Sequence, residues 1–585
     1  MRKIRKVLVA NRGEIAIRVF RACNELGIRT VAVYSKEDVL SLHRNRADEA
    51  YLVGEGDKPI DAYLDIEDII RICKEHHVDA VHPGYGFLAE NAELAKCCEE
   101  EGIIFIGPRV EHLIMFGDKV NARIQAEKAQ IPMIPGTNGA VESFDEVKAF
   151  AEEYGFPVMI KAVNGGGGRG MRNVDRMEDL EEAYHRAKSE AKMAFGSDEV
   201  YVEKCIMNPK HIEVQILGDE AGHVIHLFER DCSIQRRHQK VIEMAPAWSL
   251  PQKLREDICS AAVKLMKNVN YLNAGTVEFL VDQDEEHFYF IEVNPRVQVE
   301  HTVTEMITDV DIVKTQILIA EGYSVDSPEV AIGLQPTIWF KGVAIQCRIT
   351  TEDPQNGFMP DTGKIIAYRS GGGPGIRLDA GTAYTGAVIT PYYDSLLVKV
   401  TAHALHAKDT VHRMLRCLDE FRISGVKTNI YFLQNMLRTK DFQEGLCDVN
   451  YIDRHPQLLD EPEAISDRGT KLLHYIGDIT VNGYAGAGAK EKPDFTPVAP
   501  LFAGGETMPR GTRQMLEELG PEKFSKWIMD QKELMIMDTT YRDAHQSLLA
   551  TRVRTYDIMN AIRYTACHVP QLFSFENWGG ATFDV

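Results

Sequence analysis

Short apolar runs alternate with amphipathic stretches over the first hundred residues. The run VLVA at residues 7–10 predicts a strand, and apolar residues at helical spacing between Gly13 and Leu26 predict the helix after it. The alternation continues with strands predicted at 30–35, 78–84 and 103–107 and helices at 65–76 and 91–101. Strands separated by amphipathic helices indicate a right-handed parallel sheet, so we expect an α/β domain over residues 1–118.

The pattern changes after this region. Residues 119–155 have helical spacing, whereas residues 200–295 have the pattern of antiparallel strands with turns at 218–223 and 282–287. A further α+β stretch is predicted from Gly342 to about Tyr451. Residues 477–507 are rich in Gly, Ala, Pro and Lys and predict a linker with little core, followed by a strand at 533–540.

Four consecutive glycines follow the strand-like run Pro157–Val163, in the segment NGGGGRGM at residues 164–171. Glycine weakens strands and helices, but bare backbone can approach a phosphate closely. Lys161 stands three residues before the segment, near the end of the strand. The alternative is a flexible surface linker. A short strand-like run after the glycines favours a hairpin lid, and the absence of a G-K-[ST] ending disfavours a P-loop.

A second candidate site comes from the hairpin predicted over Ala274–Pro295. Pairing about a centre near Glu285 places three apolar pairs on one face: Val277 with Val293, Phe279 with Ile291, and Val281 with Tyr289. The same register places Glu278 opposite Glu292 on the other face, with Asn294 further along. Opposed like charges are destabilising unless a cation neutralises them, and Mg²⁺ carrying nucleotide phosphates fits best. Two solvated glutamates are the alternative.

Two dense polar runs flank this hairpin in the sequence. In RVQVEH, an extended segment projects Arg296, Gln298 and Glu300 to one side, where they could clamp an anion, donate a hydrogen bond and take a proton. ERDCSIQRRHQK (229–240) carries Gln235, His238 and Lys240, enough donors to steer phosphates. The alternatives are a salt-bridged surface strand for the first run and a solvated edge strand for the second.

Composition narrows the classes of protein. A chain of 585 residues predicts two to four domains, and its net charge of -21 argues against nucleic acid or an anionic membrane as the main partner. No apolar run has the length of a membrane span, and MRKIRK leads directly into the first strand, so we expect neither a membrane anchor nor a signal peptide. Eleven cysteines without a C-x-x-C pair indicate reduced thiols and a cytoplasmic location.

The glycine lid, strand lysine and paired glutamates resemble the ATP-grasp fold. More closely, "VANRGEIAIRV", "HPGYGFLAEN", "GGGGRGM", "ERDCSIQRRHQK" and "IEVNPRVQVEHTVTE" resemble biotin carboxylases from about Lys3 to Asp453. The resemblance implies ATP-driven carboxylation of biotin by bicarbonate through carboxyphosphate. It implies an N-terminal α/β domain (1–118), an ATP-grasp domain (119–335) and an α+β C-terminal domain (336–454).

The resemblance also implies roles for individual residues. Glu278, Glu292 and Asn294 would bind Mg²⁺, and Arg296, Gln298, Val299 and Glu300 would bind bicarbonate, with Glu300 as the base. Lys240 and Arg296 would stabilise carboxyphosphate, and Arg348 would stabilise the biotin oxyanion. Met171 and the glycines Gly165, Gly166, Gly167 and Gly168 would form the lid. The other nucleotide contacts implied are Lys119, Lys161, Glu203, Lys204, His211, Gln235 and His238.

The tail resembles a different module. "MDTTYRDAHQSLLATRVRT" (537–555) and "ENWGGATFDV" (576–585) are similar to the start of the carboxyltransferase barrel of pyruvate carboxylases. This implies that Asp543 binds a divalent metal, Mn or Zn, and that Arg542 and Gln546 contact pyruvate, at the C-terminal end of a barrel strand. For Asp543 alone, a helix N-cap or a loop salt bridge is the alternative.

The chain departs from the pyruvate carboxylase pattern after this point. A (β/α)₈ barrel takes about 250 residues, but only about fifty follow Glu533, and the A-M-K-M signature of a biotinyl carrier is absent. "EAKMAF" (190–195) is similar to it only superficially and is predicted to be a surface helix. We therefore expect an amino-terminal fragment competent at most for biotin carboxylation, with a partial allosteric region (455–530) and an incomplete barrel (531–585).

The family also implies partners, and the sequence leaves rival functions open. The implied partners are a biotinyl carrier domain, acetyl-CoA as an effector of the full-length protein, and further copies of the chain, as a dimer through the biotin carboxylase region or a tetramer at full length. The rivals are another ATP-grasp enzyme, such as an acyl-CoA carboxylase subunit or a carbamoyl-phosphate-type ligase, and a non-catalytic nucleotide-binding or assembly module. The D-T-T-Y-R-D-A-H-Q-S tail argues against the first group.

Overall fold

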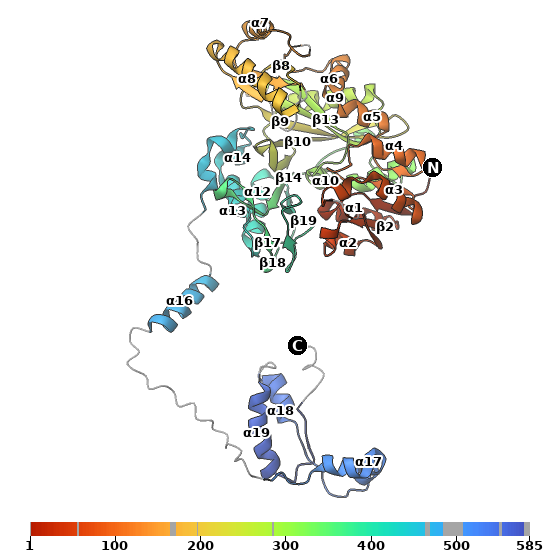
Figure 1. Ribbon diagram of the computed structural model, residues 1–585, viewed down its shortest axis with the longest axis vertical. Coiled ribbons are helices and arrows are strands. Elements are labelled where there is room, and N and C mark those ends of the chain that lie inside the picture. The colour runs from red at the N-terminus through yellow and green to blue at the C-terminus, as the bar shows by residue number, and fades with distance from the viewer. Residues whose placement is uncertain are drawn as a thin grey trace. The chain divides into compact units, whose positions relative to one another are not determined.

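The structure is a computed structural model that divides into two units, Met1–Ile465 and Ser466–Val585, each described here by itself (Figure 1). The described residues are 2–54, 56, 58–137, 139–163, 171–195, 197–282, 286–461, 468–483, 507–548 and 553–577.

The first unit begins with a parallel sheet of five strands in the order β3-β2-β1-β4-β5. The strands are β1 (Lys6–Val9), β2 (Arg29–Tyr34), β3 (Glu49–Leu52), β4 (Ala80–His82) and β5 (Ile104–Phe105). The helices predicted between them are present as α1 (Gly13–Glu25), α3 (Ile66–Glu75) and α4 (Ala92–Glu100). Asp65 and Asn91 cap α3 and α4 by accepting hydrogen bonds from backbone N–H groups of the first turn. Only β3 was not predicted, because EAYL has no continuous apolar run.

A second sheet of eight antiparallel strands forms the centre of the unit, in the order β13-β12-β9-β10-β11-β14-β21-β19. Their bounds are β9 (Lys210–Gly218), β10 (Val224–Arg236), β11 (Gln239–Ala245), β12 (Asn273–Val281), β13 (Phe288–Asn294), β14 (Val343–Thr350), β19 (Ile376–Ala380) and β21 (Leu396–Ala404). Because β11 pairs with β14, the sheet continues from the predicted ATP-grasp region into the predicted C-terminal region. Polar residues far apart in the sequence therefore share one sheet face.

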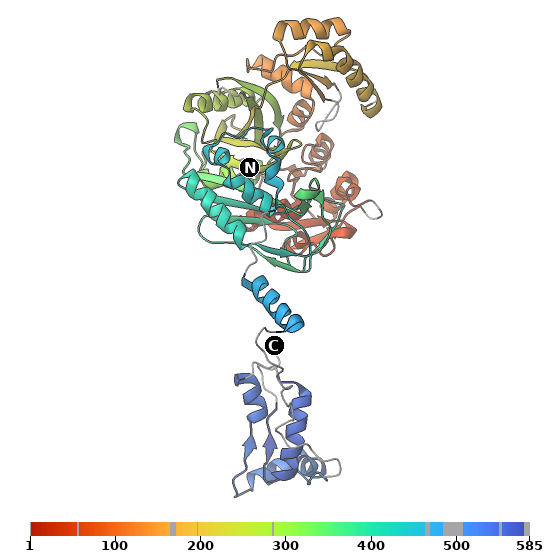
Figure 2. The same cartoon turned by 90° about the vertical axis from the view of Figure 1, so that its left-hand side faces the viewer.

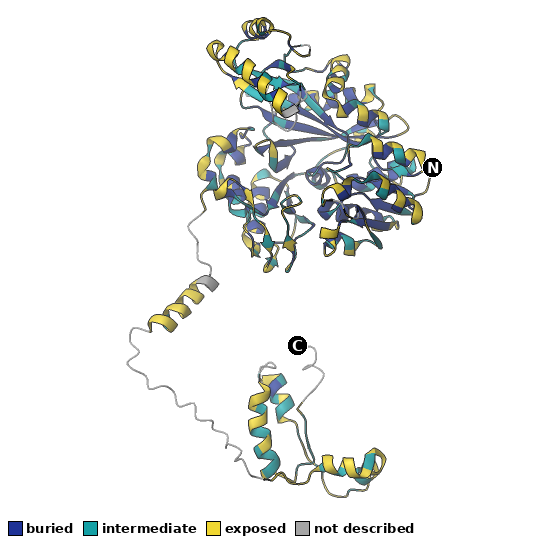
Figure 3. Ribbon diagram, viewed as in Figure 1, coloured by how far each residue is buried: buried dark blue, intermediate teal, exposed yellow. Residues whose placement is uncertain are grey.

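The two faces of this sheet differ in polarity. On β9, Ile212, Val214 and Ile216 pack in a core that includes helix α9 (Gln252–Asn268), whereas Glu213 and Gln215 alternate with them on the opposite face. Figure 3 shows the sheet strands as largely buried and the outer helix faces as exposed. Buried carboxylates on the opposite face require cationic partners.

The ERDCSIQRRHQK run lies inside the sheet and not at its edge. Its first eight residues belong to β10, which pairs with β9 on one side and β11 on the other, and Glu229 and Arg230 are fully buried. The solvated-edge alternative is therefore wrong for this run, because Glu229 pairs with Arg255 and Arg230 pairs with Glu213 in the interior.

The hairpin β12–β13 confirms the central part of the predicted register and corrects the rest. Val277 pairs with Val293 and Glu278 with Glu292, as predicted. A β-bulge then shifts the pairing by one residue, so Phe279 faces Phe290 and Val281 faces Phe288. The predicted pairs Phe279–Ile291 and Val281–Tyr289 are therefore wrong, since uniform counting from the turn cannot anticipate an extra residue.

A small sheet in the order β7-β6-β8, with β8 at Val200–Lys204, carries the segments on either side of the glycine loop. Strand β6 (Val158–Ala162) pairs antiparallel with β7 (Met171–Val174), Lys161 opposite Met171, which confirms the hairpin. Residues 164–170, including the lid glycines 165–168, lie outside the described residues. Helices α7 (Phe144–Tyr154) and α8 (Met177–Phe195) pack on this sheet; α8 contains the EAKMAF segment, as predicted. Figure 2 shows the sheet and both helices projecting from the rest of the first unit.

The second unit bears on two predictions. Helix α16 (Arg468–Asn482) includes residues 477–482, whose side chains are almost all exposed, so this part of the predicted linker is helical and contributes little core. Residues 484–506 lie outside the described residues. The strand predicted at 533–540 is reduced to β23 (Met537–Asp538), paired in parallel with β24 (Ser574–Phe575), with α19 (Thr555–His568) between them in sequence. Among the described helices of either unit, none combines the length and apolar character needed to cross a membrane.

Candidate active site

A cavity of about 1080 Å³ lies in the first unit, and nearly all the predicted site residues of that unit line it. Its walls come from the loop after β1, the β6–β8 sheet, the polar face of the eight-stranded sheet and the segment 296–300. The described predicted residues that line it are Lys119, Lys161, Met171, Glu203, Lys204, His211, Gln235, His238, Lys240, Glu278, Glu292, Asn294, Arg296, Gln298, Val299, Glu300 and Arg348.

Lys240 is at the centre of a buried cluster of carboxylates. Its ammonium group donates to Glu213, to Glu278 at 2.9 Å and to Glu300 at 2.7 Å. Burial alone would lower the pKa of Lys240, but the three carboxylates raise it well above its ordinary value. The lysine is therefore a fixed cation at the cavity wall.

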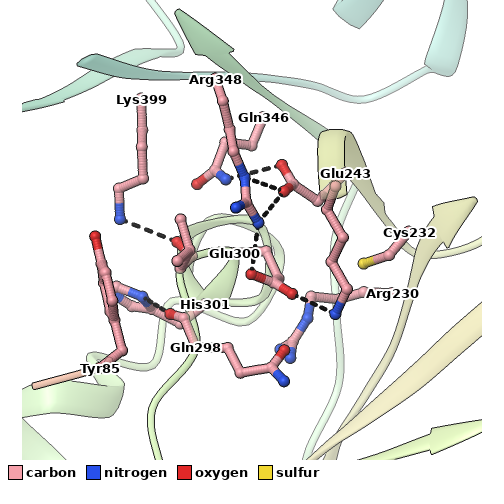
Figure 4. A network of polar contacts seen from close by, with 12 residues as sticks. Tyr85, Arg230, Cys232, Glu243, Gln298, Glu300, His301, Gln346, Arg348 and Lys399 are labelled. Atoms are coloured by element: carbon pink, nitrogen blue, oxygen red, sulfur yellow. Dashed lines mark hydrogen bonds and ion pairs between the residues drawn. The ribbon is translucent and has the colours of Figure 1, made fainter. Parts of the chain in front are cut away.

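Arg348 fixes the other oxygen of Glu300. The guanidinium donates to Glu300 at 2.9 Å and also pairs with Glu243, as Figure 4 shows. Burial would raise the pKa of Glu300, but Lys240 and Arg348 hold it far below its usual range, so Glu300 is ionised. The carboxylate is aimed into the cavity between two cations.

The paired glutamates of the hairpin differ in environment. Glu278 is buried and accepts hydrogen bonds from Asn294 at 2.9 Å and Gln298 at 3.0 Å, and it pairs with His211 at 2.9 Å. Glu292 has a side chain 36% exposed, with Lys119 3.7 Å away. Burial and, next, the charge of Glu278 raise the pKa of Glu292. The charged form of Glu292 is disfavoured by the nearby charge of Glu278. A divalent cation would remove this repulsion, and the two carboxylates and the Asn294 amide are the oxygen ligands that a hard divalent cation prefers.

The segment after the hairpin is not a strand, which corrects the prediction of an extended run. It bends before helix α10 (His301–Thr308), yet Arg296, Gln298 and Glu300 all line the cavity. Arg296 donates to Glu90 at 2.8 Å and to the Asn294 side-chain oxygen at 3.1 Å. Gln298 and Glu300 are buried, so the surface-strand alternative is wrong.

The predicted nucleotide contacts include several cations held by protein groups. Lys161 and Arg123 both pair with Glu203, Arg123 at 2.6 Å. Lys204 donates to two backbone carbonyls at 3.1 Å each, and Gln235 donates to the Cys232 carbonyl at 2.8 Å. Each of these donors is held by a carboxylate or a backbone carbonyl, and a bound phosphate group could accept hydrogen bonds from the same donors in their place.

Three buried residues of the site were not predicted: Glu213, Arg230 and Glu243. Glu213 lies directly opposite Glu278, so Glu213, Glu278 and Glu292 form a row across three neighbouring strands. Arg230 donates to Glu213 at 2.5 Å and is fully buried. Polar residues at every second position, His211, Glu213 and Gln215, indicate that Glu213 lies on the polar face of a strand. The sequence does not give the register of β9 against β12, which places Glu213 beside Glu278.

The second unit presents its candidate residues differently. Arg542 pairs with Asp543 at 3.1 Å and with Glu576 at 3.0 Å, and the Asp543 side chain is 56% exposed. Gln546 lies in the short π-helix Ala544–Leu548. Among the described residues, no group of three His, Cys or carboxylate side chains close enough to hold an ion includes Asp543. Asp543 ends the short helix α18 (Thr540–Asp543), and its contacts are those of an exposed salt bridge.

Comparison with known proteins defines the class. Three family models match: "Biotin carboxylase, N-terminal domain" at residues 3–113, "Carbamoyl-phosphate synthase L chain, ATP binding domain" at 118–327, and "Biotin carboxylase C-terminal domain" at 346–454. The biotin carboxylase domain of the Hydrogenobacter thermophilus 2-oxoglutarate carboxylase, crystallised as a dimer with magnesium ADP and bicarbonate, is 47% identical with a TM-score of 0.73. The match covers 79% of this chain and 100% of that domain. The chain belongs to the biotin carboxylase family.

Within that family, the chain is similar along its whole length to pyruvate carboxylases. It is 63% identical over 583 residues to the Bacillus subtilis pyruvate carboxylase, covering 100% of this chain and 50% of that protein. The Rhizobium etli pyruvate carboxylase, solved with the allosteric activator acetyl coenzyme A, is 50% identical with a TM-score of 0.74; the match covers 100% of this chain and 52% of that one. The chain thus spans about half the length of the curated relatives it matches.

Proposed function

We propose that the chain catalyses ATP- and bicarbonate-dependent carboxylation of biotin. The strongest support is the placement of Glu300 between Lys240 and Arg348 in the cavity, because an ionised base held by two cations suits deprotonation of a small anion and stabilisation of the charge that follows. Family membership and the ligands of the Hydrogenobacter structure agree with this reaction class.

In the proposed reaction, an oxygen of bicarbonate attacks the γ-phosphorus of ATP, and the bond to ADP breaks. Glu300 takes the proton of bicarbonate, which Arg296, Gln298 and the backbone of Val299 orient. Carboxyphosphate then breaks its C–O bond to give CO₂ and phosphate beside biotin. The phosphate released takes the N1 proton of biotin. Lys240 and Arg296 stabilise the phosphate charge, and Arg348 stabilises the ureido oxyanion, whose N1 then attacks CO₂.

The nucleotide would occupy the end of the cavity near the β6–β8 sheet. The residues assigned to it are Lys119, Lys161, Met171, Glu203, Lys204, His211, Gln235 and His238, with glycines 165–168 as the cover. Glu278, Glu292 and Asn294 would hold Mg²⁺, which when bound neutralises charge on the transferring phosphates. Gathering these cations locally allows a chain of net charge -21 to bind a polyanion.

The chain's whole-length similarity to pyruvate carboxylases supports a longer proposal. In it, carboxybiotin on a carrier domain delivers its carboxyl group to pyruvate to give oxaloacetate. Arg542 and Gln546 would contact pyruvate and Asp543 would bind Mn or Zn at the carboxyltransferase site. Acetyl-CoA as an effector, a dimer or tetramer, and a cytoplasmic location belong to this proposal.

Steady-state turnover tests the first proposal. Purified chain with Mg·ATP should release ADP only when both bicarbonate and free biotin are present. A non-catalytic nucleotide-binding module would bind Mg·ATP without turnover, and a carbamoyl-phosphate-type ligase would turn over without biotin. Either result would overturn the proposal.

A further inference from the structure

The two peptide groups on either side of Val299 are each held by a buried side chain that no role above uses. The Gln298 carbonyl accepts a hydrogen bond from His301 Nδ1 at 2.7 Å, and the Val299 carbonyl accepts one from Lys399 Nζ at 3.0 Å. Figure 4 shows both residues beside Glu300. Building on the proposed function, we infer that His301 and Lys399 are positioning residues that aim the Val299 N–H and the Glu300 carboxylate at bicarbonate.

His301 has a defined tautomer. A carbonyl can only accept, so Nδ1 carries the hydrogen, while Nε2 is buried and accepts no hydrogen bond from the described residues. The ring is fully buried, and burial, opposed by the charge of Glu305, lowers the pKa of His301 to about 3. The imidazole is therefore a neutral donor with a fixed direction.

Fixing the Gln298 carbonyl also fixes the Val299 N–H. The two groups belong to one planar peptide, which is trans because the cis peptides of the described chain lie elsewhere, so they point in opposite directions. Val299 lines the cavity, and its N–H donates to no other group in the described part of the chain. An unpaired backbone donor at a cavity wall, held from behind by His301, is arranged to receive an anion.

Lys399 holds the next peptide. It lies on β21 directly opposite Arg348 on β14, so both side chains leave the same sheet face. Its fully buried ammonium group pairs with Glu14 at 3.0 Å, and the other oxygen of Glu14 accepts from the Tyr85 hydroxyl at 2.6 Å. Lys399 thus links the Val299 carbonyl to Glu14 and, through it, to Tyr85, which belong to two other segments. Because that carbonyl precedes Glu300 in the backbone, its direction sets where the Glu300 side chain starts.

A purely structural role is the competing explanation, since His301 begins α10 and Glu300 provides no side-chain cap for it. The two explanations differ in what they affect. Loss of a purely structural contact lowers the thermal midpoint. Loss of a positioning contact raises KM for bicarbonate and leaves Kd for Mg·ATP nearly unchanged.

The test compares variants of the full chain in the biotin- and bicarbonate-dependent assay, with KM for bicarbonate, kcat, Kd for Mg·ATP and thermal midpoint measured for each. His301→Phe removes the side-chain donor and keeps only the longer contact from the backbone N–H of residue 301 to the Gln298 carbonyl, at 3.4 Å. His301→Asn keeps a side-chain N–H close to the position of Nδ1. Lys399→Met removes the second donor at similar volume. His112→Phe is the matched control, because His112 is another buried histidine bonded to a backbone carbonyl, Val269 at 3.0 Å, away from the cavity.

We expect His301→Phe and Lys399→Met to raise KM for bicarbonate tenfold or more and to lower kcat, with Kd for Mg·ATP changed less than threefold. His301→Asn should stay within about threefold of wild type, and His112→Phe should lower only the thermal midpoint. If His301→Phe does not fold, His301→Ala takes its place.

Unchanged KM for bicarbonate in the folded donor-less variants, or an equal loss in His301→Asn and His301→Phe, would overturn the inference. Absence of turnover in the wild-type chain would instead overturn the proposed function, so the two failures are distinguishable.

Discussion

The central cavity of the first unit and the Asp543 region of the second unit both contain charged residues singled out by sequence, but they hold them in different ways. In the cavity, Glu278 and Glu300 are buried and pair with cations from other strands, such as Lys240, 38 and 60 residues away. Asp543 is half-exposed and pairs with its sequence neighbour Arg542.

The difference shows when a sequence motif indicates a functional site that the fold holds in a fixed geometry. A buried charge is tolerated only with partners in fixed geometry, so a cluster of such charges reports a site that the fold maintains. An exposed ion pair between neighbours contributes about 0–1 kcal/mol and is common without function. The predictions below test this contrast, from the largest expected effect to the smallest.

The largest effect is expected for Lys240→Met. It leaves three buried carboxylates without their shared cation, so turnover should fall by at least about 10³-fold and the free energy of unfolding by about 3–5 kcal/mol. ADP release and urea unfolding measure the two quantities. Lys532→Met, at an exposed position of the second unit, is the control and should change neither; a near-normal Lys240→Met enzyme would refute the role of the cluster.

The next effect concerns the hairpin glutamates. Glu292→Ala should lower Mg·ATP turnover by about 10²-fold or more, because it removes a proposed Mg²⁺ ligand. The fold should stay intact, because the Glu292 side chain is partly exposed and its charge is repelled by that of Glu278. Circular dichroism and turnover across a Mg²⁺ titration test this. Glu220→Ala, in an exposed turn, is the control. Wild-type turnover of Glu292→Ala would rule out the metal assignment.

A third effect is on acid stability of the first unit. Burial lowers the pKa of both His43 and His82 to about 4, from an ordinary value near 6.5. Both are neutral when folded, so the unfolded chain binds more protons below pH 6.5. Stability is complete above that pH and is lost as pH falls towards 4, by about 2 kcal/mol for each histidine at pH 5.

Urea unfolding between pH 7.5 and 5 measures this loss. His82→Asn removes one titrating group while keeping an acceptor near Nδ1, which accepts from the Gly84 N–H. The variant should show a shallower fall in stability with pH than wild type, and an equal slope in both proteins would contradict the assignment.

The smallest effect is expected in the second unit. Asp543→Asn should change the free energy of unfolding by less than about 0.5 kcal/mol and leave biotin carboxylation unchanged, because Asp543 is exposed and lies outside the first unit. A loss of bicarbonate-dependent ADP release in this variant would show that the two units are coupled in the reaction.

Much of the first unit could be predicted from periodicity. The parallel sheet followed from alternating apolar runs and amphipathic helices, and the Glu278–Glu292 pair followed from counting residues across one hairpin. The count failed beyond Glu278 because a bulge inserts one residue, which no local pattern encodes.

The other site residues could not be predicted because the sequence does not give the register between strands far apart in the chain. Glu213 joins the site only because β9 pairs with β12, and Lys399 only because β21 pairs with β14. Both residues are charged positions in apolar strands, a pattern that predicts a buried partner without saying which one. The strand predicted at 533–540 is shorter than expected because its apolar residues lack packing partners. In the described part of the second unit they have little to pack against, and Leu534 is 88% exposed.

Transfer of oxygen from bicarbonate to phosphate tests the central claim most directly. The chain is incubated with Mg·ATP, free biotin and ¹⁸O-labelled bicarbonate, and the released phosphate is analysed by mass spectrometry. Attack of a bicarbonate oxygen on the γ-phosphorus, followed by C–O cleavage, predicts one ¹⁸O atom in each phosphate released. Unlabelled phosphate during biotin-dependent turnover would mean that water and not bicarbonate is phosphorylated, and would contradict the account.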